Sequence, residues 1–88
     1  MNRQEVYKLI DGERNHQDEL HGNDLHSPEE WLVYIESYID DAKRILTRES
    51  KAANVNERVM SNFRKIAAMA VAAMEQHDTP PRISWKTS

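Results

Sequence analysis

The sequence predicts an all-α fold in which three helices per chain pack into a helical-bundle homo-oligomer. The 88 residues include only 2 Gly and 3 Pro, which disfavours a turn-rich all-β fold. Three segments carry apolar residues at helical spacing, and two of them begin with capping signals. The apolar run 66–74 has nine residues without a polar side chain, far fewer than the roughly 20 that span a membrane.

The first helix is expected over about 3–21. Val6, Leu9 and Ile10 form a short apolar stripe at helical spacing. Gly22 follows and is a typical helix stop. Because the stripe is short, we expect this helix to depend on packing against its neighbours.

The second helix is expected over about 28–48 and has the clearest start. Ser27 stands at the N-cap, Pro28 at the first helical position and Glu30 at the third, which is the pattern of a capping box. The apolar positions follow a spacing of three and four, and they are Trp31, Tyr34, Ile35, Tyr38, Ile39, Ala42, Ile45 and Leu46.

The third helix is expected over about 55–76, with Asn54 as N-cap and Glu57 three residues on. It carries two apolar stripes. The first is a heptad-like seam of Val59, Phe63, Ile66, Ala70, Ala73 and His77, and the second holds Met60, Ala67, Val71 and Met74. Two apolar faces need two neighbours, and a chain this short predicts that a second copy supplies one of them.

Residues 1–78 are expected to form a single helical domain, followed by a C-terminal tail at 79–88 that begins near Pro80 and Pro81. The net charge of −3 argues against nucleic-acid binding. The absence of Cys and of an apolar signal segment at the N-terminus favours the cytoplasm and no membrane attachment.

A candidate site lies on the flanks of the second and third helices that face each other. Asp41 stands at the edge of the apolar stripe and needs a polar partner. Lys65 and Asn62 occupy the matching flank of the third helix, so an Asp41–Lys65 ion pair is one expectation and a ligand-binding pair is another. The four His residues lack the spacing of a zinc site.

Three stretches of the sequence resemble the MazG-like all-α nucleoside triphosphate pyrophosphohydrolases, in particular their small phage-type members. The resemblance spans roughly 13–82. It rests on Glu13-Arg-Asn-His-Gln-Asp-Glu-Leu-His-Gly22, on Ser27-Pro-Glu-Glu-Trp-Leu-Val-Tyr-Ile35 and on the Ala-rich Ile66–Glu75. For a phage-encoded member, the implied location is the host cytoplasm.

Active members of that family carry E-E-x-x-E on one helix and E-x-x-D on the next, and these carboxylates hold Mg²⁺. The resemblance aligns the first motif with Ser37, Tyr38 and Asp41, and the second with Asn62 and Lys65. Only Asp41 keeps a carboxylate, and an ammonium at a ligand position repels a divalent cation. The resemblance therefore implies degenerate metal motifs and no cofactor, with Mg²⁺ expected only if hydrolysis is retained.

Three functions remain open. The first is a catalytically inactive MazG-like protein that binds a nucleotide or nucleotide-like signal between the second and third helices. Lys65 would contact phosphate, Asn62 would supply polar contacts, and Tyr38 or Trp31 would stack a base. The second is a phage-type regulatory factor that acts on a host protein. The third is a Mg²⁺-dependent pyrophosphohydrolase with an atypical site.

Overall fold

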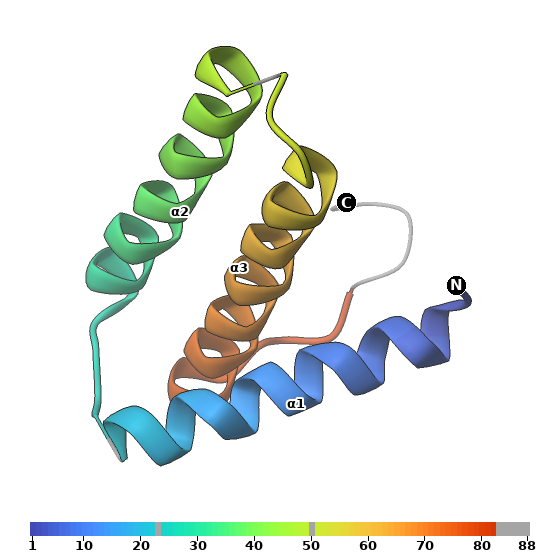
Figure 1. Cartoon of the computed structure of the whole chain (residues 1–88). Helices are drawn as coiled ribbons and strands as arrows, with labels where there is room; N and C mark the ends of the chain where they lie inside the picture. The colour runs from blue at the N-terminus through green and yellow to red at the C-terminus, as the bar shows by residue number, and fades with distance from the viewer. Residues whose placement is uncertain (23, 50, 83–88) are drawn as a thin grey trace.

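The computed structural model describes residues 1–22, 24–49 and 51–82. These residues form three helices and no strand: α1 (Arg3–His21), α2 (Pro28–Arg48) and α3 (Val55–His77) (Figure 1). The prediction of an all-α chain with three helices is confirmed. Of the expected tail, residues 79–82 are not helical, and residues 83–88 lie outside the described part of the chain.

Local signals explain where the helices begin. Ser27 Oγ accepts a hydrogen bond from the Glu30 amide at 3.1 Å, and Glu30 Oε1 accepts one from the Ser27 amide at 3.0 Å. The predicted capping box of α2 is thus confirmed. At the start of α1, the side chain of Asn2 accepts a hydrogen bond from the Glu5 amide at 2.9 Å, a cap that was not predicted from the sequence.

Asn54 stands at the N-cap of α3, as predicted, but the capping hydrogen bonds expected there do not form. Asn54 adopts a left-handed conformation with φ 57° and its side chain makes no cap hydrogen bond. A capping side chain reaches the helix amides from extended backbone, so the left-handed conformation explains the loss. The α2–α3 turn is closed instead by Arg58, which binds both carboxylate oxygens of Glu49 at 2.8 and 3.3 Å.

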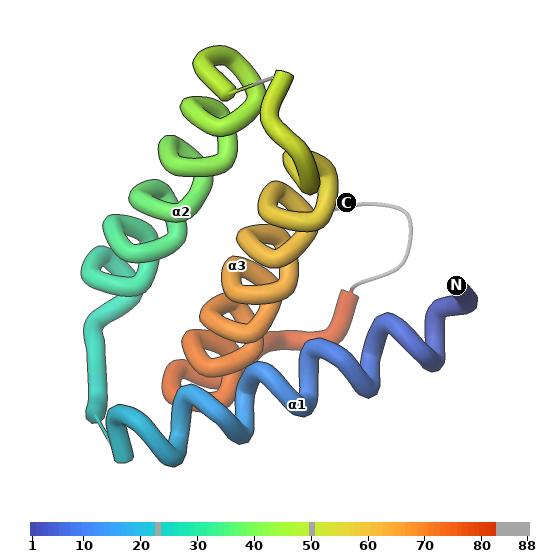
Figure 2. The backbone as a smooth tube through the Cα atoms, in the orientation of Figure 1, coloured from blue at the N-terminus to red at the C-terminus, as the bar shows by residue number. Residues whose placement is uncertain are grey.

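α3 is the central element of the fold. α2 runs beside it over most of its length, whereas α1 crosses the C-terminal half of α3 at a wide angle (Figures 1 and 2). Within the described residues, α1 and α2 do not pack against each other. They diverge from the connecting loop, so the three helices form an open arrangement rather than a closed bundle (Figure 2).

Among the residues that the structure describes, the core is small and comes from α2 and α3 alone. The buried apolar side chains are Ala42, Ile45, Val59, Ala68, Met69 and Ala72, and α1 buries none of its residues. Phe63, which periodicity placed on the same seam as Val59, is 57% exposed. The physical reason is that α1 and α2 cover other sides of α3, and neither reaches the side that carries Phe63.

The three helices were compared with the length and hydropathy of membrane-spanning helices. Among the described residues, no helix has both the length and the apolar character that crossing a bilayer requires.

Candidate functional site

A cleft of about 840 Å³ lies where α1 and α2 diverge, with α3 as its floor. The connection between α1 and α2 also lines the cleft, through Asp24, Leu25 and His26. All three helices contribute to the lining: Gln17 and His21 come from α1, Trp31 and Tyr38 from α2, and Lys65 and Gln76 from α3, among others. A pocket between α2 and α3 was expected from the sequence; in the structure α1 forms a further wall.

An aromatic cluster forms the α2 wall of the cleft. The rings of His26, Trp31 and Tyr34 meet edge to face, with centroid distances of 4.9 Å for His26–Trp31, 5.0 Å for His26–Tyr34 and 6.2 Å for Trp31–Tyr34. This geometry is the one that ring quadrupoles prefer. Trp31 is partly exposed and Tyr34 is 41% exposed, so both keep surface that a planar ligand can cover.

Gln76 fixes the α1–α2 loop to the end of α3. Its Oε1 accepts from Trp31 Nε1 at 2.9 Å and from the His26 amide at 3.1 Å, while its Nε2 donates to the Asp24 carbonyl at 3.0 Å. His77 Nε2 lies 2.7 Å from the His26 carbonyl oxygen. A carbonyl only accepts, so this nitrogen carries the proton. Gln76 was not among the residues nominated from the sequence, where its position just after the Ala-rich run is its one distinguishing feature.

Ion pairs join α1 to α3 along the floor of the cleft. Arg14 donates to both carboxylate oxygens of Glu75, each at 3.1 Å, and also pairs with Asp18. Arg64 donates to Glu13 at 2.8 Å. Burial opposes the charge of Arg14, but the hydrogen bonds to Asp18 and Glu75 outweigh it and raise the pKa of this guanidinium. The acidic groups of the cleft are therefore largely neutralised by arginines.

Lys65 has a different environment. Its ammonium lies 5.6 Å from the centroid of the Tyr38 ring, a cation–π distance. Among the described residues, no carboxylate forms an ion pair with Lys65. The expected Asp41–Lys65 ion pair is wrong, because Asp41 is held by other groups.

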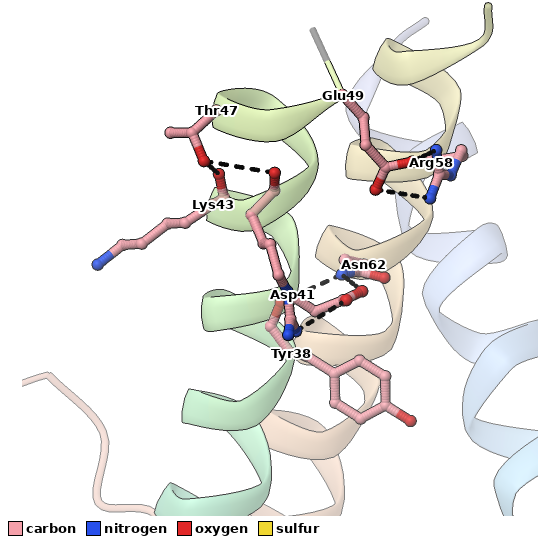
Figure 3. Close-up of polar contacts among 8 residues, drawn as sticks. Tyr38, Asp41, Lys43, Thr47, Glu49, Arg58 and Asn62 are labelled. Atoms are coloured by element: carbon pink, nitrogen blue, oxygen red, sulfur yellow. Dashed lines mark hydrogen bonds and ion pairs between the residues drawn. The ribbon is translucent and has the colours of Figure 1, made fainter. Parts of the chain in front are cut away.

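Asn62 holds Asp41 and the backbone of α2 (Figure 3). Its Nδ2 donates to Asp41 Oδ2 at 3.0 Å and to the Tyr38 carbonyl at 3.1 Å, and the residue is only 5% exposed. Arg44 donates to Asp41 Oδ1 at 3.2 Å. The hydrogen bond from Asn62 and then the charge of Arg44 lower the pKa of the Asp41 carboxyl.

The six residues nominated from the sequence thus separate into three groups. Trp31, Tyr38 and Lys65 line the cleft. Asn62 and Asp41 join α2 to α3 and lie outside the described cleft lining. Ser37 is exposed on α2 and is not among the described residues that line the cleft.

The residues at the positions compared with the metal motifs do not fit Mg²⁺. Asp41 is the only carboxylate among them, and Asn62 and Arg44 occupy its oxygens. Across 1–22, 24–49 and 51–82, no group of three or more His, Asp or Glu side chains converges as a metal site would require.

Comparison of the chain with protein-family models, with curated proteins and with solved structures finds no match.

Proposed function

We propose that this chain is a MazG-like helical protein that binds a nucleotide or nucleotide-like signal in the α1–α2 cleft without hydrolysing it. The observation that carries the proposal is the presence, in one open cleft, of an aromatic wall and of a lysine that is not paired with a described carboxylate. The proposal includes self-association of the chain, since its core is small for its surface.

The aromatic wall of the cleft, which consists of the His26–Trp31–Tyr34 cluster and of Tyr38, suits a base. Tyr34 and Tyr38 are 41% and 37% exposed, and Trp31 is partly exposed beside them. Stacking of a base on an aromatic side chain contributes about 1–3 kcal/mol and tolerates different bases. The hydrogen bond from Trp31 Nε1 to Gln76 fixes the indole, so little side-chain entropy is lost when a ligand binds.

Lys65 suits a phosphate. Its cation–π contact with Tyr38 is worth about 0.5–1 kcal/mol at an exposed site. A charge-assisted hydrogen bond contributes about 1.5–3 kcal/mol. The ammonium therefore gains by turning from the Tyr38 ring to a phosphate oxygen. Arg14 is less available, since Glu75 and Asp18 already hold its guanidinium.

Binding is favoured over hydrolysis by the chemistry around Asp41. Metal-dependent phosphoryl chemistry needs carboxylates that hold a cation against the phosphates. At the positions compared with the metal motifs, Asp41 is the single carboxylate, and its oxygens accept hydrogen bonds from Asn62 and Arg44. Arg14 and Lys65 both line the cleft, and Lys65 is the one that is not paired with a described carboxylate, so its ammonium can neutralise phosphate charge without a metal.

A thermal-shift panel tests this proposal. The panel contains nucleoside mono-, di- and triphosphates and cyclic dinucleotides, each with the parent, Lys65→Ala and Lys43→Ala. Lys43 extends from α2 into solvent (Figure 3), so its variant matches the charge change away from the cleft. We expect at least one nucleotide to raise the Tm of the parent and of Lys43→Ala but not of Lys65→Ala.

Two results would contradict the proposal. One is a panel in which no nucleotide raises the Tm of the parent. The other is Mg²⁺-dependent release of pyrophosphate from a nucleoside triphosphate by the parent, which would assign the chain to the hydrolases instead.

A further inference from the structure

The charged residues that line the cleft are more often acidic than basic. The lining includes two cations and four carboxylates, namely Arg14 and Lys65 against Glu13, Asp18, Asp24 and Glu75. Arg64, which is not among the lining residues, neutralises Glu13 through a hydrogen bond of 2.8 Å. With the histidines neutral, the remaining carboxylates still outnumber the two lining cations, and the whole chain has a net charge of −3.

Arg14 divides its one positive charge between two carboxylates. It donates to both oxygens of Glu75, each at 3.1 Å, and also pairs with Asp18. The Arg14 side chain is only 15% exposed, whereas those of Asp18 and Glu75 are 54% and 52% exposed. A ligand that approaches this cluster therefore meets carboxylate oxygens before it meets the guanidinium.

Lys65 lies apart from the Arg14 cluster. Ten positions on α3 separate it from Glu75, which corresponds to about 15 Å along the helix axis. Its ammonium lies 5.6 Å from the centroid of the Tyr38 ring, and it forms no ion pair with a carboxylate of the described residues. The two lining cations thus do not converge on one phosphate, and Lys65 alone supplies unpaired positive charge.

The charge of a phosphate depends on how many of its oxygens are esterified. A phosphodiester carries one negative charge, whereas a phosphate monoester carries about −1.5 to −2 at pH 7. Each further phosphate of a di- or triphosphate adds to that charge. One ammonium balances one negative charge, and the excess would remain in a cleft whose other uncompensated groups are carboxylates. A cleft that is lined by one sign of charge disfavours ligands of the same sign.

We infer that the ligand of the cleft is a nucleotide whose phosphate is a singly charged diester, as in a cyclic nucleotide or a dinucleotide, and that the cleft discriminates against di- and triphosphates. This inference rests on the proposed function, because it takes Lys65 as the phosphate contact. It adds the charge class of the ligand, which the proposed function leaves open.

Calorimetric titration with ligands that share one nucleoside tests the inference. For each base, the series contains the 3′,5′-cyclic monophosphate, the linear dinucleoside monophosphate, the cyclic dinucleotide, and the 5′-mono-, di- and triphosphate. EDTA is present, so that no divalent cation offsets the phosphate charge. We expect a diester to bind at least about tenfold more tightly than the triphosphate of the same base. The diester that binds most tightly distinguishes the cyclic from the linear source.

Salt and charge variants test the cause of the preference. The gap between diester and triphosphate should be wide at about 0.01 M salt and narrow at about 1 M, because the screening length falls from about 30 Å to about 3 Å. Glu75→Gln and Asp24→Asn each remove one lining carboxylate and should strengthen triphosphate binding more than diester binding. Glu36→Gln is the control, since Glu36 is exposed on α2 and is not among the cleft-lining residues, and its variant should keep the parent's gap.

A triphosphate that binds as tightly as every diester of the same base, in a manner that Lys65→Ala abolishes, would overturn this inference and leave the proposed nucleotide site intact. A gap that Glu36→Gln narrows as much as Glu75→Gln and Asp24→Asn do would overturn the role of the cleft carboxylates. The absence of binding by every ligand in the series would instead contradict the proposed function, and the inference with it.

Discussion

Trp31 Nε1 donates a hydrogen bond to Gln76 Oε1 at 2.9 Å, which joins the first turn of α2 to the last turn of α3. The same oxygen accepts from the His26 amide, so one side chain satisfies the indole and the loop backbone together. Because these groups border the aromatic wall, the shape of the cleft depends on a residue that is 45 positions away from Trp31 in sequence.

Replacement of Gln76 tests this dependence. Gln76→Ala removes the partner of Trp31 Nε1 and of the His26 amide, and each part-buried group left unpaired costs about 1–3 kcal/mol. We expect a loss of unfolding free energy in that range in urea denaturation. Gln4→Ala, at an exposed position of α1, is the control and should change stability little. Equal stability of the two variants would show that Gln76 does not hold the loop.

The docking of α1 rests on charged contacts, since α1 buries no side chain. A double-mutant cycle on Arg14→Ala and Glu75→Ala should give a coupling free energy near 1 kcal/mol, at the upper end for surface pairs. Two hydrogen bonds and the low exposure of the Arg14 side chain, 15%, are the reasons. The same cycle on Arg44 and Asp41, whose side chains are 56% and 48% exposed, is the control. A coupling no larger than this control would contradict the expectation.

Because the fold lowers the pKa values of three carboxyl groups, we expect the protein to lose stability in acid. The Ser27 amide lowers the pKa of Glu30, the hydrogen bond from Asn62 lowers the pKa of Asp41, and the hydrogen bond from Arg58 lowers the pKa of Glu49. The unfolded chain binds protons at these groups more readily than the folded chain does. Their stabilisation is therefore complete above the ordinary values of 4.5 for Glu and 3.8 for Asp, and it is lost as the pH falls through the lowered values.

Melting temperatures measured across this acid range check the prediction. The Tm of the parent should fall as the pH falls, and the Tm of Asp41→Asn should fall less steeply, because one of the three titrating groups is gone. A parent Tm that stays constant or rises below the ordinary carboxyl range would contradict it.

Local sequence signals predicted the helices well. The capping box at Ser27 is present, and the apolar spacing of α2 and α3 located both helices, because caps and periodicity act within a few residues. Asn54 shows where such reasoning fails: its side chain has the chemistry of a cap, but the turn that precedes α3 holds its backbone in the left-handed region.

The candidate site was predicted only in part, because it depends on contacts between distant residues. Periodicity gave α3 two apolar stripes but could not say that α1 crosses α3 and that Phe63 stays exposed. Trp31, Tyr38 and Lys65 were nominated from the sequence and do line one cleft. Gln76 and Arg14 were missed, since their partners lie 45 and 61 residues away, respectively.

The central claim is that the cleft binds a nucleotide through Lys65, and calorimetric titration of the nucleotide that most raises the Tm tests it most directly. The claim predicts saturable binding by the parent and by Lys43→Ala, at least about tenfold weaker binding by Lys65→Ala, and recovery of most of the affinity in Lys65→Arg, which keeps the charge. Equal affinity of the parent and Lys65→Ala, or the absence of binding heat from every nucleotide tried, would contradict the claim.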